Sequence, residues 1–172
     1  MPATAQDAEQ RIEASRAVVQ AFSKELRERL MEAMQAGGPV EAIAVCNAAA
    51  PQIAESHSEA RGWAVGRTSL KVRNPGNVPD AWERGVLQQF EARRAAGEDP
   101  AAVEFAEVVD RGGAKVFRYM KAIPTAEPCL ACHGSNLAPE VAAKLSQLYP
   151  QDTATGFAAG DLRGAFTIEQ PM

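Results

Sequence analysis

The sequence predicts an α+β fold, in which an antiparallel β-sheet is flanked by helices and a long helix stands at the N-terminus. The chain begins with a long stretch whose apolar residues repeat every three or four positions, which is the period of a helix. Residues 103–110 and 114–123 have strand-like composition, and Arg111-Gly112-Gly113 between them is typical of a hairpin turn. Two helices followed by strands that helices interrupt indicate α+β rather than repeated βαβ units.

The first predicted helix covers about residues 5–36. One apolar stripe follows it: Val19, Phe22, Leu26, Leu30 and Met34. Gly37-Gly38-Pro39 ends the helix, because glycine can adopt the left-handed cap conformation and proline cannot continue the helix. We expect the stripe to pack in the core. The exposed N-terminal part of so long a helix could pair with another subunit, which leaves a homodimer open.

A second helix is predicted over about residues 39–56, with a proline in its first turn. Its apolar face carries Ile43, Cys46, Ala50 and Ile53, spaced three, four and three apart. The third cysteine of the chain therefore lies on a buried face among small residues. Pro51 is expected to kink or divide this helix, because it removes a backbone donor.

Residues 62–68 then predict a strand with Trp63 and Val65 on one face. Residues 70–80 are rich in proline, glycine and asparagine, so this stretch is expected to be an irregular loop, and such loops are often functional. Asp80 caps a third helix over about 81–96, which Gly97 ends. Its inward residues are expected to be Trp82, Val86, Leu87 and Phe90.

The remaining elements are a helix over about 139–149 and a short final strand over 164–169. A length of 172 residues is most simply one domain, 1–172, with the N-terminal helix in 1–36 and the core in 37–172.

Composition excludes several classes of protein. Hydrophobic residues make up 46% of the chain and charged residues 23%, as in ordinary globular proteins. No apolar run approaches the roughly 20 residues that span a bilayer. A net charge of −4 and the absence of a basic cluster argue against binding to nucleic acid.

The most informative motif is Cys-x-x-Cys-His, from Cys129 to His133. Two thiols three residues apart can bond to the two vinyl groups of one haem, and the adjacent imidazole then becomes an axial iron ligand. A thioredoxin-like pair would open a helix after a strand in a βαβ unit, whereas this motif follows Glu127-Pro128 late in the chain. A structural zinc site needs four ligands, and the chain offers no second Cys-x-x-Cys and only one other histidine, His57. The motif therefore predicts one covalently attached haem c.

Several residues could complete such a site. Cys46 is a candidate second axial ligand because it is a thiol on a buried helical face. The other candidates for that position are Met31, Met34, Met120 and His57. Arg67 and Arg73 are candidates for contacts with the haem propionates.

Haem attachment of this type takes place outside the cytoplasm, so a periplasmic or otherwise extracytoplasmic location is expected. Residues 1–6 have neither a basic start nor an apolar stretch. We therefore expect that a signal peptide has been removed from this chain.

Several stretches together resemble one family, the PAS-like c-type haem domain found in bacterial secreted and sensor-associated proteins. The matching pieces are 67–75 with Asn77 and Pro79, 117–121, 129–134, and 149–164 through Tyr149-Pro150, Asp152, Thr155-Gly156, Gly160-Asp161 and Gly164. The resemblance implies a PAS-like antiparallel sheet flanked by helices. It also implies that the iron is held by the motif histidine and by a cysteine of an N-terminal helix, which are His133 and Cys46 in this chain.

This ligand pair favours a redox or gas sensor. Thiolate stabilises ferric iron, so release of Cys46 on reduction would leave a position for carbon monoxide or nitric oxide. The alternative is a periplasmic monohaem electron-transfer cytochrome that passes electrons to a redox partner. A haem enzyme would need an open iron and a distal acid–base residue, which we do not identify, so we expect a protein that is not an enzyme.

Overall fold

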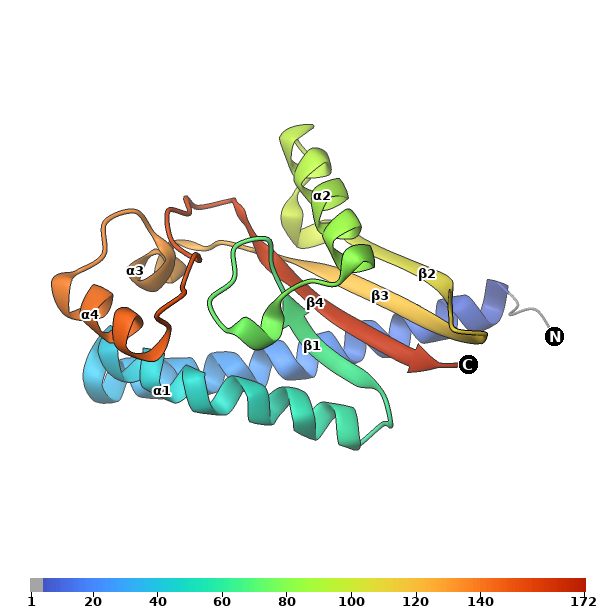
Figure 1. Cartoon of the computed structure of the whole chain (residues 1–172), viewed down its shortest axis with the longest axis horizontal. Coiled ribbons are helices and arrows are strands. Elements are labelled where there is room, and N and C mark those ends of the chain that lie inside the picture. Colours follow the sequence, from blue (N-terminus) through green and yellow to red (C-terminus); the bar gives the residue numbers. More distant parts are fainter. Residues whose placement is uncertain (1–4) are drawn as a thin grey trace.

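The computed structural model describes residues 5–172 and has an α+β fold (Figure 1). A long helix, α1 (Ala5–Glu59), packs on one face of an antiparallel sheet, and helix α2 (Ala81–Ala95) packs on the other. The predicted fold class is therefore confirmed. The first four residues of the predicted N-terminal segment 1–36 lie outside the described residues.

Helix α1 is a hairpin of two helical segments. Gly37 (φ −151°, ψ 15°) and Gly38 (φ 71°, ψ −161°) depart from helical geometry, and the chain reverses there (Figure 1). The break predicted from Gly37-Gly38-Pro39 is thus confirmed. The expected division of the helix at Pro51 is wrong, because the second segment continues to Glu59 with helical backbone angles, whereas a kink there stays a prediction. Ala50 and Ile53 on either side of this proline are buried, and their packing offsets the one lost backbone hydrogen bond.

Within the described residues the sheet has four strands: β1 (Ala64–Thr68), β2 (Glu104–Arg111), β3 (Ala114–Pro124) and β4 (Leu162–Pro171). Their order is β1-β4-β3-β2, and all neighbouring pairs are antiparallel. Gly112 and Gly113 form the β2–β3 turn with φ of 65° and 89°, which glycine adopts readily. Strand β4 is longer than predicted, because its pairing with β3 continues to Pro171.

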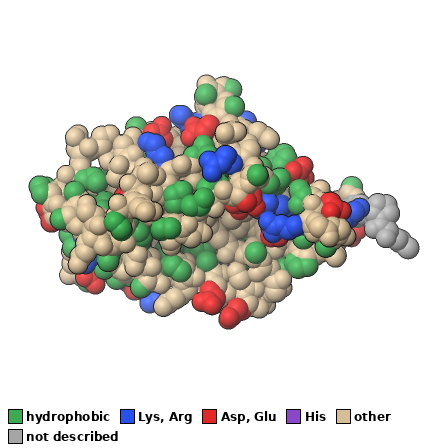
Figure 2. Space-filling view, in the orientation of Figure 1, with side chains coloured by type: hydrophobic (Ala, Val, Ile, Leu, Met, Phe, Trp, Pro, Cys, Tyr) green, Lys and Arg blue, Asp and Glu red, His purple; other side chains and the backbone are tan. Residues whose placement is uncertain are grey.

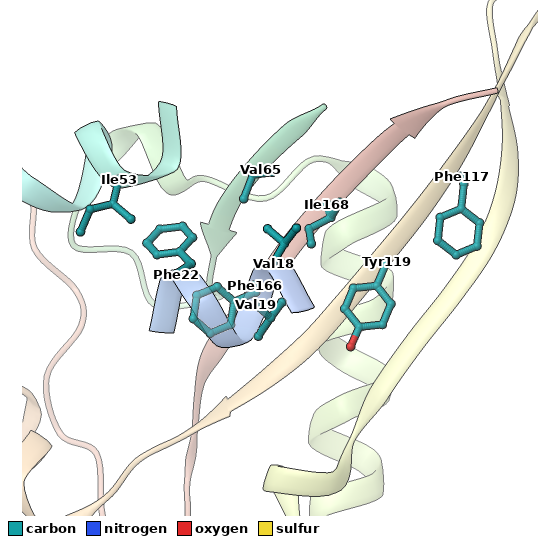
Figure 3. Close-up of a cluster of buried hydrophobic side chains, with 9 residues drawn as sticks. All are labelled: Val18, Val19, Phe22, Ile53, Val65, Phe117, Tyr119, Phe166 and Ile168. Atoms are coloured by element: carbon teal, nitrogen blue, oxygen red, sulfur yellow. The ribbon is translucent and has the colours of Figure 1, made fainter. Parts of the chain in front are cut away.

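One apolar cluster fixes α1 to the sheet (Figure 3). It consists of nine buried side chains: Val18, Val19, Phe22, Ile53, Val65, Phe117, Tyr119, Phe166 and Ile168. Phe117 and Tyr119 point to this side because alternate residues of a strand share a face. Both segments of α1 contribute, Phe22 from the first and Ile53 from the second. The cluster therefore sets the position of the segment that carries Cys46.

Helix α2 covers the opposite face of the sheet. The Asp80 side chain accepts from the Glu83 backbone N–H at 2.8 Å, and the Glu83 carboxylate accepts from the Asp80 N–H at 2.9 Å. This reciprocal capping box fixes the start of the helix. The apolar cluster beneath it is formed by Val86, Leu87, Phe90, Val103, Met120, Ala122, Leu162 and Ala165. The predicted cap and the predicted inward face are both confirmed.

The short helical turns η1 (Pro75–Asn77) and η2 (Pro100–Ala102) lie in the loops around α2. Beyond β3 the chain forms η3 (Glu127–Cys129), α3 (Leu130–His133) and α4 (Pro139–Leu148) at one end of the molecule (Figure 1). Val141, Leu145 and Tyr149 pack there against Ile43 of α1.

The surface drawn in Figure 2 carries acidic and basic side chains close to one another. Within residues 5–172, no helix has the length and apolar character needed to cross a membrane.

Candidate functional site

The motif Cys129–His133 forms a single short helical turn after β3. Cys129 ends η3, and Cys132 and His133 belong to α3. Both thiols are free and half-buried. Residues three apart on a helix share one side, so the two thiols are suited to bind a single planar group.

The His133 ring is held by the loop after α4. Its Nδ1 lies 2.8 Å from the carbonyl oxygen of Ala154, which can only accept, so Nδ1 carries the proton. The Phe157 ring meets the imidazole edge-on at 6.1 Å between centroids. The backbone N–H of Phe157 donates to the His133 carbonyl at 2.9 Å. These contacts fix the ring and leave the lone pair of Nε2 for a ligand bond, as is common for metal-binding histidines.

Burial, together with the nearby charges of Arg163 and Arg73, lowers the pKa of His133 to about 3. The imidazole is therefore neutral at physiological pH. Neutral imidazole is the form that binds a metal.

Gly134 allows the tight exit from α3. A Cβ atom at this position would lie 2.6 Å from the carbonyl oxygen of Leu130, although the backbone itself is extended with φ −75°. We expect Gly134→Ala to lower the free energy of unfolding by about 1–3 kcal/mol, because the backbone of the motif must shift. Gly85→Ala is the matched control: that glycine lies inside α2 with no atom in the way, so we expect a gain of about 0.5–1 kcal/mol. Urea unfolding of both variants measures the difference, and equal effects would contradict this role of Gly134.

Arg73 connects the motif to the loop that holds His133. Its guanidinium donates to the Cys132 carbonyl at 2.6 Å and to the Ala154 carbonyl at 3.1 Å. It also forms an ion pair with Asp152 at 3.0 Å, and the two side chains are only 11% and 9% exposed. The same arginine thus contacts both the turn with the cysteines and the carbonyl that orients the histidine. Whether Arg73 also meets a propionate stays a prediction.

Arg163 contacts the unprotonated ring nitrogen of His133. Its Nε donates to His133 Nε2 at 3.4 Å, and its Nη1 lies 3.2 Å from both Ser69 Oγ and the Lys71 carbonyl oxygen. Burial, followed by the charges of Arg73 and Arg67, lowers the pKa of Arg163 to about 10. Sequence reasoning missed this residue, because a single arginine at the start of a strand gives no pattern.

Arg67, Arg73 and Arg163 form what we call the arginine cluster. The positive charge of each of the three lowers the pKa of His133, and the charges of Arg73 and Arg67 also lower the pKa of Arg163. Arg67 stands on β1 with its guanidinium carbon 5.7 Å from the centre of the Phe22 ring. The structure therefore brings Arg67 and Arg73, both predicted from the sequence, into the neighbourhood of His133.

Cys46 lies in the second segment of α1 and is half-buried. Burial raises the pKa of its thiol, and the charge of Arg67 opposes that rise. Burial also raises the pKa of the Cys132 thiol. The positive charge of Arg73 opposes this rise, and the nearby Cys46 thiol adds to it. Cys132 packs against the apolar cluster that includes Ile43, one helical turn before Cys46. Cys46 therefore belongs to the same neighbourhood as the motif.

Two of the other candidate ligands, Met120 and His57, make contacts away from the motif. Met120 is fully buried under α2, in the cluster on the far face of the sheet. His57 stacks on Phe22 at 5.8 Å, and its Nε2 lies 3.6 Å from a Glu25 oxygen. Met31 is 49% exposed. Among the described residues, no group of three or more His, Cys, Asp or Glu side chains is arranged to hold a metal ion.

Comparison with known proteins gives one family. The chain matches the model of the Tll0287-like family over residues 2–171. It is similar to a solved structure described as the "Crystal structure of the cyanobacterial heme-protein Tll0287", with 28% sequence identity and a TM-score of 0.67. The match covers 92% of this chain and 96% of that one. No protein with a curated description matches.

Proposed function

The chain belongs to the Tll0287-like family, and from this premise we propose that it carries one covalently attached haem c and acts as a redox or gas sensor. The similar cyanobacterial protein is described as a haem protein, which supports haem binding here. Covalent attachment, the ligand pair and sensing are our proposals. An extracytoplasmic location goes with them, because haem of this type is attached there.

The observation that carries the proposal is the hydrogen bond from His133 Nδ1 to the Ala154 carbonyl. It presents a neutral imidazole with an unprotonated Nε2, whose lone pair accepts from Arg163 Nε at 3.4 Å and is available to iron once that contact is given up. Two free thiols lie on the same turn. The arginine cluster adds positive charge that suits the two propionates of a haem. The residues therefore fit a c-type haem, with Cys129 and Cys132 as the attachment points.

We propose Cys46 as the second axial ligand. It is the one cysteine of the chain outside the motif, and its charge influences Cys132. Burial raises the pKa of the Cys46 thiol, and the charge of Arg67 opposes that rise and so supports the thiolate, which is the form that binds iron.

The haem would supply an iron that cycles between ferric and ferrous states. Thiolate is a good ligand for the ferric state, whereas the more electron-rich ferrous state favours protonation and release of Cys46. Because Cys46 is part of α1, its release would remove a link between the haem and a helix that packs on the sheet, and that helix would then be able to shift. That movement is the signal we propose, and carbon monoxide or nitric oxide would take the position that Cys46 leaves.

The test is the addition of carbon monoxide to the reduced protein. We expect the Soret band of the reduced protein to shift on addition, because Cys46 has left the iron. A matched sample of the oxidised protein is expected to show no shift. If the Soret band of the reduced protein does not shift with carbon monoxide and the protein passes electrons quickly to a partner, the result favours an electron-transfer cytochrome instead.

A further inference from the structure

Arg163 is a half-buried cation that forms no ion pair with a carboxylate within residues 5–172. Its acceptors among the described residues are His133 Nε2, Ser69 Oγ and the Lys71 carbonyl, none of which is charged. A guanidinium has five N–H donors and pairs best with a carboxylate.

Asp152, the acid near Arg163, already has other partners. Asp152 pairs with Arg73 at 3.0 Å, and its other oxygen accepts from the Ala154 N–H at 2.8 Å. Arg67 likewise forms no ion pair within residues 5–172, and its guanidinium lies against the Phe22 ring. The arginine cluster therefore holds three positive charges against one negative charge. Two further carboxylates would neutralise it.

An iron bond to His133 would also change the contacts of Arg163. The lone pair of Nε2, which now accepts from Arg163 Nε at 3.4 Å, would be taken by the metal. The guanidinium would then lose an acceptor and keep only Ser69 and the Lys71 carbonyl. An anionic group that arrives together with the iron would replace it.

We propose, on the basis of the haem attachment proposed above, that Arg163 binds a propionate carboxylate of the haem. Arg67 is the second cation near Arg163. Arg73 already forms an ion pair with Asp152. The ligand class is a planar carboxylate, which matches the fork of a guanidinium. Arg163 thereby sets the ionisation of the propionate and, through it, the reduction potential.

The experiment measures the midpoint potential of the haem protein from acid to alkaline pH, in wild type, Arg163→Gln and Arg163→Lys. The potential falls with pH where a propionate loses its proton. We expect this fall to move to higher pH by about one unit or more in Arg163→Gln, because a nearby cation lowers a carboxyl pKa by about 1–3 units. Arg163→Lys keeps the charge and should stay close to wild type.

Arg94→Gln is the matched control. Arg94 lies on α2 and pairs with Glu91 and Asp161, outside the arginine cluster. Its loss removes the same charge from the chain and should leave the curve unchanged. A curve of Arg163→Gln that superimposes on wild type, or an equal shift in Arg94→Gln, would overturn the inference.

Two outcomes need a second measurement. If Arg163→Gln does not yield haem protein, infrared difference spectra of wild type and Arg163→Lys test the inference. Replacing a guanidinium by an ammonium must shift the carboxylate band of a propionate that residue 163 binds. An unchanged band overturns the inference. The mass of the wild-type protein separates this failure from failure of the proposed function: without covalent haem on the wild type, it is the proposed function that fails.

Discussion

Arg73→Leu is expected to lower the free energy of unfolding by about 3–5 kcal/mol, because it leaves a buried carboxylate without its cation. Asp152, the partner, is 9% exposed and lies 3.0 Å from the guanidinium. The variant also loses the hydrogen bonds to the carbonyls of Cys132 and Ala154. Since Ala154 orients His133, we expect the fraction of chains with attached haem to fall as well. Urea unfolding and the haem-to-protein absorbance ratio measure both effects.

A double-mutant cycle isolates the ion pair. Asp152→Asn in the Arg73→Leu background removes the unpaired charge and should recover part of the lost stability. Arg94→Leu is the control at a more exposed ion pair: the Arg94 side chain is 35% exposed, and its substitution should lower the free energy of unfolding by at most about 1 kcal/mol. A loss in Arg73→Leu no greater than in Arg94→Leu would show that Arg73 does not hold the site together.

Arg118→Met is expected to have an effect of similar size, about 3–5 kcal/mol, on the far face of the sheet. The Arg118 side chain is 5% exposed and lies within 2.8 Å of Asp80, 3.3 Å of Glu83 and 3.4 Å of Glu169. Its guanidinium also covers the Trp82 ring at 4.2 Å. Without the arginine, three neighbouring carboxylates lose a shared cation.

The loss should depend on pH. Burial opposes ionisation of Asp80, but the Glu83 backbone N–H, Arg118 and Arg111 outweigh it and lower the pKa of the Asp80 carboxyl. A lowered pKa adds stability above the unfolded value of about 3.9, and that stability is lost as the pH falls through the folded value. The destabilisation by Arg118→Met should therefore be largest at neutral pH and shrink below about pH 4.

Arg111→Met is the control for this cluster. Arg111 contacts Glu169 at 2.6 Å and Asp80 at 3.4 Å, but it is 56% exposed. We expect a loss of at most about 1 kcal/mol from the exposed arginine. Thermal unfolding at neutral and acid pH compares the two variants, and a pH-independent loss in Arg118→Met would contradict the electrostatic explanation.

Features encoded by neighbouring residues could be predicted from the sequence. Gly37-Gly38-Pro39 marked the break in α1, and Gly112-Gly113 marked the hairpin turn. Asp80 marked the start of α2, because its cap uses the backbone three residues on. Pro51 was misjudged for the opposite reason. The helix tolerates this proline because its apolar face packs against residues that are distant in the sequence. A prediction from neighbouring residues does not include that packing.

In the candidate site, too, the features encoded by neighbouring residues could be predicted, and those that depend on distant residues could not. Cys129, Cys132 and His133 form one motif and could be recognised locally. The apolar helical face made Cys46 one of several candidate ligands, and only the family resemblance singled it out. The contacts of His133 with the Ala154 carbonyl and with Arg163 span 21 and 30 residues, and neither a backbone carbonyl nor a single arginine forms a pattern. Only the fold brings them together.

The most direct test of the proposed ligand pair is the absorption spectrum of the oxidised protein, produced with c-type haem maturation, as wild type and as Cys46→Ser. Our account predicts covalent haem in both proteins, with a thiolate-type low-spin ferric spectrum in wild type that Cys46→Ser lacks. Met34→Leu, which changes a candidate ligand on the first segment of α1, should keep the wild-type spectrum. An unchanged spectrum in Cys46→Ser would contradict ligation by Cys46 and the redox switch that depends on it.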